Sequence, residues 1–137
     1  MIVITTFYNA GNYIEQCVGS IIGQNFNDFK CYLIDDMSTD DSVNKVKSMI
    51  DGDDRFQLIV NTEKKYKTLN FIDVLKNESI DDNDIVVEID GDDWLPNAST
   101  LKRIHETYSD NNVWITNGSF KYATGEMGFS SPQVNFD

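Results

Sequence analysis

Three acidic side chains occupy four consecutive positions of the segment IDGDDWLP, residues 89–96. Asp90, Asp92 and Asp93 come directly after a strand-like segment that opens with the apolar run at 85–87. Carboxylates this close raise one another's pKa or require a counter-charge, and the chain already carries a net charge of −12. A turn needs one Asp or Gly, but not three carboxylates. The segment therefore predicts a bound cation.

The other potential metal ligands of the chain limit which cation this is. Cys17 and Cys31 stand inside apolar segments without CxxC spacing, which is typical of buried thiols in a reducing compartment. His105 is the single histidine and falls on the apolar face of a helical pattern, so we expect a core residue rather than a ligand. A site built from oxygens favours magnesium, manganese or calcium over zinc.

Composition indicates one globular domain and excludes several classes of protein. With 137 residues, 40% of them hydrophobic, the chain can bury a sizeable core. Its 23 acidic and 11 basic residues argue against binding to nucleic acid backbones, which depends on Lys and Arg. The apolar runs are too short for a membrane span, and the start lacks the features of a signal peptide. We expect a cytoplasmic protein.

Apolar runs of strand length alternate with segments of helical periodicity. Strands are expected at 2–5, 29–34, 56–60 and 85–89, with a further strand beginning at 113–116. Helices are expected at 13–22, 43–50, 68–76 and 101–108, the third with Leu69, Ile72 and Leu75 on its apolar face. This alternation predicts an α/β domain: a mostly parallel, Rossmann-like sheet flanked by helices on both faces. No linker or repeat divides residues 1–137.

Polar clusters follow three of the expected strands. TFYN comes after the first, DDMS after the second and DGDD after the fourth. Ligands of open α/β sheets bind beyond the carboxyl ends of the strands, so we expect these clusters to form one site. The S-x-x-D spacing of Ser38 and Asp41 predicts a capping box for the following helix, which leaves Asp35 and Asp36 unexplained.

Spacing rejects other acidic motifs. An EF-hand loop beginning at Asp82 or Asp90 fails, and the glycines of a P-loop or dinucleotide fold do not follow the first strand. In a phosphoacceptor receiver domain the acidic pair should follow the first strand, whereas Asp35 and Asp36 follow the second.

The segment ITTFYNAGNYIEQCVGSIIGQNFNDFKCYLIDDMSTDDS resembles the amino-terminal signature of glycosyltransferase family 2, which has the GT-A fold. The shared features are a strand ending in T-x-Y-N, a helix ending in S-I-x-x-Q and a strand ending in D-D-x-S-x-D. DGDDWLP is similar to the D-x-D-D motif of the family, at the expected distance. The resemblance covers residues 1 to about 118, and 119–137 form a turn-rich tail. It implies a nucleotide-sugar-binding GT-A domain.

The resemblance assigns roles to the residues that match the motifs. Thr6 and Tyr8 would line the nucleotide pocket, with Tyr8 stacking on the base. Asp36 would accept a hydrogen bond from a ring N–H of the base, which favours uracil or thymine. Asp90 would contact the ribose or share the metal, and Asp92 would coordinate Mn²⁺ or Mg²⁺ at the donor diphosphate.

Two further positions have less definite roles. Asp93 could ligate the metal or orient the sugar, and Lys67, in the basic run at 64–67, could contact a phosphate or be a solvated surface residue. A diphosphate would be repelled by a chain of charge −12, so the cation would neutralise both and stabilise the departing nucleoside diphosphate.

The resemblance implies a metal-dependent glycosyltransferase that transfers the sugar of a nucleotide-diphosphate donor, with a UDP-sugar favoured, to an acceptor hydroxyl. It also implies inversion at the sugar and a carboxylate as general base. The acceptor and the sugar are not encoded in recognisable motifs. Glu126 is the one carboxylate of the tail before the terminus and a poor candidate for the base. We expect the base beyond Asp137, with this chain the donor-binding half of a longer enzyme truncated at its C-terminus, or else a natural short form. Two alternatives stay open: a noncatalytic nucleotide-sugar-binding module without the acceptor half, and a calcium-binding or phosphoacceptor domain without affinity for nucleoside diphosphates.

Overall fold

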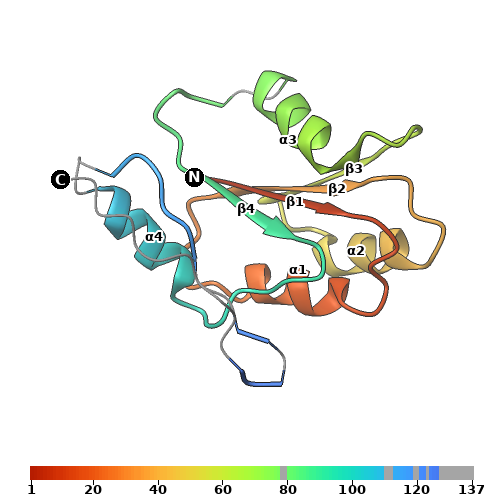
Figure 1. Ribbon diagram of the computed structural model, residues 1–137, viewed down its shortest axis with the longest axis horizontal. Helices are drawn as coiled ribbons and strands as arrows, with labels where there is room; N and C mark the ends of the chain where they lie inside the picture. Colours follow the sequence, from red (N-terminus) through yellow and green to blue (C-terminus); the bar gives the residue numbers. More distant parts are fainter. Residues whose placement is uncertain (78–79, 110–112, 119–120, 123, 127–137) are drawn as a thin grey trace.

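The computed structural model describes residues 1–77, 80–109, 113–118, 121–122 and 124–126. Its centre is a four-stranded sheet in the order β3-β2-β1-β4 (Figure 1). The strands are β1 (Ile2–Phe7), β2 (Lys30–Asp35), β3 (Phe56–Val60) and β4 (Val86–Asp90), and all neighbours run parallel. The predicted parallel α/β architecture is confirmed, and the carboxyl ends of all strands lie along one edge.

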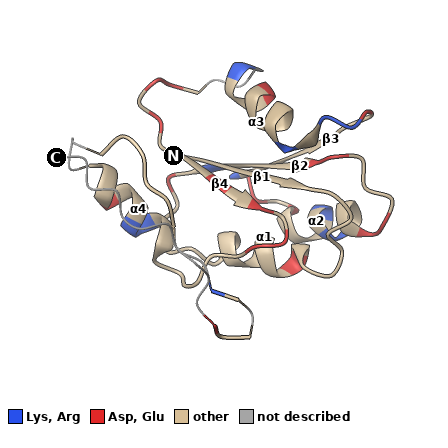
Figure 2. Cartoon of the chain, in the orientation of Figure 1, with Lys and Arg blue, Asp and Glu red and all other residues tan. Residues whose placement is uncertain are grey.

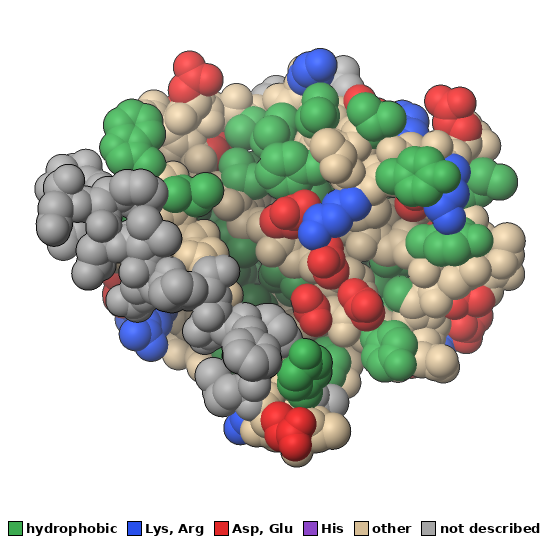
Figure 3. Space-filling model, in the orientation of Figure 1, with side chains coloured by type: hydrophobic (Ala, Val, Ile, Leu, Met, Phe, Trp, Pro, Cys, Tyr) green, Lys and Arg blue, Asp and Glu red, His purple; other side chains and the backbone are tan. Residues whose placement is uncertain are grey.

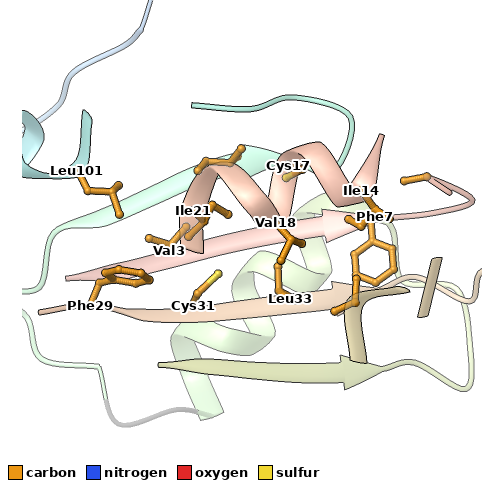
Figure 4. Close-up of a cluster of buried hydrophobic side chains, with 13 residues drawn as sticks. Val3, Phe7, Ile14, Cys17, Val18, Ile21, Phe29, Cys31, Leu33 and Leu101 are labelled. Atoms are coloured by element: carbon orange, nitrogen blue, oxygen red, sulfur yellow. The ribbon is translucent and has the colours of Figure 1, made fainter. Parts of the chain in front are cut away.

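Helices cover both faces of the sheet. Helices α1 (Ile14–Ile22), α2 (Ser42–Ile50) and α4 (Thr100–Tyr108) lie on one face, and α3 (Tyr66–Asn77) lies on the other (Figure 1). The larger core forms on the first face, where side chains of β1 and β2 meet α1, among them Val3, Val18 and Leu33 (Figure 4). The smaller core lies under α3. Burial on both faces explains the apolar runs of the two central strands, β1 and β2.

Helix α3 buries a different face from the one its periodicity predicts. Leu69 and Leu75 are 55% and 38% exposed, whereas Asn70 and Val74 are 2% and 3% exposed. Val74 packs on the smaller core, and the buried Asn70 side chain donates a hydrogen bond to Asp36. A polar contact, which apolar periodicity cannot show, thus sets the rotation of α3.

Two predictions near the C-terminus are wrong. Residues 113–116 form no strand; Trp114 and Ile115 are 94% and 84% exposed, with no neighbouring strand among the described residues to pair with. His105 is exposed rather than buried, and its ring lies against Phe26 with 5.0 Å between ring centroids. Leu101 fills the core position on α4, so the helix does not need His105 there.

Other predictions are confirmed or fall outside the described part. Cys17 and Cys31 are free and fully buried. Most of the tail at 119–137 lies outside the described residues, although Gly125 closes a turn by donating its N–H to the carbonyl of Tyr122. Within the described ranges, no helix has the length and apolar character needed to cross a membrane.

Candidate functional site at the carboxyl edge of the sheet

A hollow of about 270 Å³ opens where β1 and β4 end. Five residues singled out from the sequence line it together: Thr6, Tyr8, Lys67, Asp90 and Asp92. The parallel register explains part of this, because it places Thr6 opposite Asp90. Figure 3 shows acidic side chains gathered around a basic one on this face, with hydrophobic side chains beside them.

Gly91 brings the acidic residues to the rim of the hollow. Its N–H donates to the carbonyl of Thr6 at 3.2 Å, so the chain after β4 stays against β1. A Cβ at Gly91 would collide with the Cβ of Phe7 and lie 3.1 Å from its Cα. We call residues Asp90–Asp93 the acidic turn. Sequence reasoning missed Gly91, although a glycine inside an acidic cluster was the available signal for close backbone approach.

The acidic turn carries the crowded negative charge that its sequence predicts. Partial burial raises the pKa of Asp93, and the neighbouring Asp92 and Asp90 carboxylates raise it further, against an opposing effect of Lys67. The Lys67 ammonium lies 2.6 Å from Asp90 and 3.6 Å from Glu88. A lysine thus supplies part of the counter-charge expected from the sequence.

The described side chains do not form a complete metal cage. Among these residues, no group of three or more His, Cys, Asp or Glu is arranged to hold an ion. Mg²⁺ at phosphate sites is commonly held by one or two carboxylates together with substrate oxygens. Asp90 and Asp92 on the rim of the hollow fit that smaller requirement, and Asp93 follows them in the turn without lining the hollow.

Asp36 does not line the hollow and is 3% exposed, although its N–H donates to the carbonyl of Phe7, a lining residue. Its carboxylate accepts hydrogen bonds from the backbone N–H groups of Lys65 and Tyr66, at 2.8 and 3.0 Å. The side-chain amides of Asn61 and Asn70 donate to it at 3.2 and 3.0 Å. Burial raises the pKa of Asp36, but these four hydrogen bonds outweigh it and lower the pKa below its ordinary value. An ionised carboxylate offers roughly four acceptor sites, so the donors of the protein already use most of its capacity.

Basic residues mark the segment between β3 and α3 (Figure 2). We call residues 62–67 the lysine segment. The Lys64 ammonium lies 3.1 Å from the centroid of the Tyr8 ring, and Lys67 reaches Asp90. Lys65 points elsewhere and pairs with Asp73 at 2.8 Å. The basic run is therefore not merely a solvated surface, since two of its three lysines contact residues of the site.

The loops after β1 and β2 are tied together beside the hollow. The Asn9 N–H donates to Ser38 Oγ at 2.8 Å, and Asn9 Oδ1 accepts the Thr39 N–H at 2.8 Å. Ser38 is thus engaged with Asn9 and does not cap α2, and Asp41, at the N-cap position, makes no capping hydrogen bond. The predicted capping box is wrong. Asp40 takes over part of its role by accepting the N–H of Ser42 at 3.1 Å.

Comparison with other proteins agrees with this fold. A glycosyltransferase of Haemophilus influenzae is 27% identical over 121 residues, covering 88% of this chain and 46% of that protein. The mannosyltransferase PcManGT from Pyrobaculum calidifontis, solved in complex with GDP-Man and Mn²⁺, superposes with a TM-score of 0.71 at 25% identity, covering 82% of this chain and 33% of that one. S. aureus TarS in complex with UDP-GlcNAc superposes with a TM-score of 0.66 at 20% identity, covering 88% and 38%.

The chain therefore spans less than half the length of each of these relatives. The sequence profile of glycosyl transferase family 2 matches residues 2–135, nearly the whole of it. With the parallel GT-A sheet and the polar clusters at its carboxyl edge, this match establishes that the chain belongs to glycosyl transferase family 2.

Proposed function

We propose that the hollow between β1 and β4 binds the nucleoside diphosphate of a sugar donor, as the donor site of a metal-dependent glycosyltransferase. The observation that carries the proposal is that the carboxylates of Asp90 and Asp92 share one hollow with the Lys67 ammonium. Carboxylates can hold a divalent cation, and an ammonium can meet phosphate oxygens. Relatives that bind GDP-Man with Mn²⁺, or UDP-GlcNAc, support the ligand class.

The proposal assigns a role to each residue that the sequence motifs singled out for nucleotide binding. The half-exposed ring of Tyr8 offers a face for the base, and Thr6 lines the same hollow at the end of β1. Lys67 contacts the diphosphate. Asp36 selects uracil or thymine by accepting a ring N–H, which requires a free acceptor site or the exchange of one of its present donors.

The acidic turn fits Mn²⁺ or Mg²⁺, because its donors are carboxylate oxygens; partial burial raises the pKa of Asp93, and the neighbouring carboxylates raise it further. Asp92 and Asp90 would hold the ion, and Asp93 would ligate it or orient the sugar. When bound, the ion would neutralise the diphosphate and stabilise the departing nucleoside diphosphate.

The proposed reaction is transfer of the sugar to an acceptor hydroxyl, with inversion. None of the described residues that line the hollow is assigned as general base, and we propose that the base lies outside residues 1–137. A second candidate is a noncatalytic donor-binding module, and one observation favours it: Asp90, a carboxylate on the rim of the hollow, is already paired with the Lys67 ammonium at 2.6 Å.

Calorimetric titration with UDP, GDP and dTDP, each with and without Mn²⁺, tests donor binding. We expect UDP to bind most tightly and only weakly without metal. Asp92→Asn should weaken Mn²⁺-dependent binding about tenfold or more, the scale of losing a hydrogen bond or contact to a charged group. Asp82→Asn, in the exposed turn before β4, is the matched control. Equal affinity of UDP for the Asp92 variant and the control would reject the metal assignment.

Release of UDP from a UDP-sugar, with and without acceptor sugars, separates the two candidates. A positioned general base contributes about 10²–10⁴ in rate, so we expect slow hydrolysis of the donor and poor transfer by this chain. Brisk acceptor-dependent release would show that the base lies within residues 1–137.

A further inference from the structure

A closed set of hydrogen bonds joins three polar side chains beneath the start of α3. Asn70 Nδ2 donates to Asp36 at 3.0 Å, while Asn61 Nδ2 donates to Asp36 at 3.2 Å and to Asn70 Oδ1 at 2.7 Å. We call these three residues the amide network. Asn70 is 2% exposed and Asn61 is half-buried. Neither asparagine lines the hollow, so the proposed donor site does not by itself explain them.

The network ends on the backbone of the lysine segment. Asp36 accepts the N–H groups of Lys65 and Tyr66 at 2.8 and 3.0 Å. Tyr66 has a φ of +61°, which is uncommon for a residue with a Cβ. Such a conformation persists only where the surroundings hold it in place. The two hydrogen bonds to Asp36 hold the backbone at this residue and the one before it.

The two anchored residues lie between the two lysines that contact residues of the site. Lys64 lies over the Tyr8 ring and Lys67 lies against Asp90, at 3.1 and 2.6 Å. The chain contains 23 acidic residues, so a lysine on an unanchored segment would have many other carboxylates to pair with. Fixing the backbone between Lys64 and Lys67 therefore limits where both ammonium groups can stand.

We propose that Asn61 and Asn70 are positioning residues for phosphate recognition. Through Asp36 they hold the lysine segment so that Lys67 lines the hollow and Lys64 lies over the Tyr8 ring before the ligand arrives. Groups held in their bound arrangement lose less conformational freedom on binding, which increases affinity. This inference rests on the proposed function, because it concerns the same hollow.

The primary test compares Asn70→Ala with Val74→Ala. Val74 lies one turn further along α3 and is 3% exposed, but it packs on the apolar core under the helix and is outside the amide network. In saturating Mn²⁺ we expect Asn70→Ala to raise the Kd for UDP about threefold to tenfold, the scale of ordering one flexible side chain on binding. Val74→Ala should raise it less than about twofold, since it leaves the network intact. Asn61→Ala, at a half-buried position, gives the same direction if Asn70→Ala folds poorly.

A double-mutant cycle separates positioning from a general loss of stability. If Asn70 acts through the lysines, Asn70→Ala should have little further effect on UDP binding in a Lys64→Met/Lys67→Met background. Hydrogen exchange supplies a second readout: the amides of Lys65 and Tyr66 should lose protection in Asn70→Ala and keep it in Val74→Ala.

Two results would overturn the inference and leave the proposed function standing. One is equal affinity of Asn70→Ala and Val74→Ala for UDP, and the other is an undiminished effect of Asn70→Ala in the background without the two lysines. Failure of the unaltered chain to bind UDP, GDP or dTDP would instead overturn the proposed function, and the inference with it.

Discussion

Replacing Lys67 with methionine should strengthen the binding of free Mn²⁺ and weaken the binding of UDP. The Lys67 ammonium lies 2.6 Å from Asp90 and 3.6 Å from Glu88. If Asp90 holds a cation, Mn²⁺ must compete with this ammonium for the same carboxylate. Methionine keeps most of the stem length and removes the charge, so it relieves the competition but also removes a phosphate contact.

The structure sets the size of the effect on metal binding. The Lys67 and Asp90 side chains are 49% and 42% exposed, and such solvent-screened ion pairs contribute about 0.2–1 kcal/mol. An ammonium that stayed about 6 Å from a divalent cation in water would add a repulsion of about 1.4 kcal/mol. Because the flexible lysine can move away from the ion, we expect only part of the combined ion-pair and repulsion energies to be recovered in the variant. Binding of Mn²⁺ should become about twofold to tenfold tighter.

The assay is a titration of Mn²⁺ followed by electron paramagnetic resonance, then calorimetry with UDP at saturating Mn²⁺. UDP should bind about threefold to tenfold more weakly to the variant, as expected for losing one exposed charge contact to phosphate. Lys65→Met is the matched control, because Lys65 belongs to the same segment but pairs with Asp73. Weaker or unchanged Mn²⁺ binding by Lys67→Met would refute the competition for Asp90.

Three other perturbations have defined outcomes. Gly91→Ala, whose Cβ would collide with β1, should lower the free energy of unfolding by about 1–3 kcal/mol, whereas Gly118→Ala, with open space around it, should leave the thermal midpoint unchanged. Burial, together with the negative charge of the acidic turn, raises the pKa of the Cys17 thiol to about 12, and Cys31 is equally buried. Neither thiol should therefore react with a disulfide reagent at pH 8 until the protein is unfolded. The pKa of Asp36 is lowered in the folded state, so its contribution to the free energy of unfolding is complete above the unfolded pKa of about 4 and is lost as the pH falls through the folded value. Asp36→Asn should therefore make the free energy of unfolding less dependent on pH in the acid range. An unchanged dependence would contradict the role of its four hydrogen bonds.

The sheet and its order of elements could be predicted because the signal is local. Strand residues such as Ile4 and Leu33 are buried within continuous apolar runs, and such runs alternating with helical periodicity are typical of parallel α/β sheets. The convergence of Thr6 and Asp90 follows from the same topology, since parallel strands bring their carboxyl ends to one edge. These expectations need no knowledge of side-chain contacts.

The parts that could not be predicted depend on polar contacts between distant positions. Asp36 and Asn70 are 34 residues apart, and their hydrogen bond turns α3 away from the face that Leu69 and Leu75 predict. The sequence likewise does not show toward which neighbour a lysine side chain extends. It could not show that Lys67 pairs with Asp90 while Lys65 pairs with Asp73. Hydrophobic periodicity is blind to such pairings because they do not repeat along the chain.

The ammonium of Lys64 over the Tyr8 ring has a consequence for the heat of ligand binding. The Lys64 ammonium lies 3.1 Å from the ring centroid. A base that stacks on this face must therefore displace a charged group, and not water alone. Burial of apolar surface is what makes the heat-capacity change of binding negative, and this face is already partly covered. Nucleotide binding should therefore show a smaller negative heat-capacity change than the area of a stacked base would suggest, and Lys64→Met should alter it.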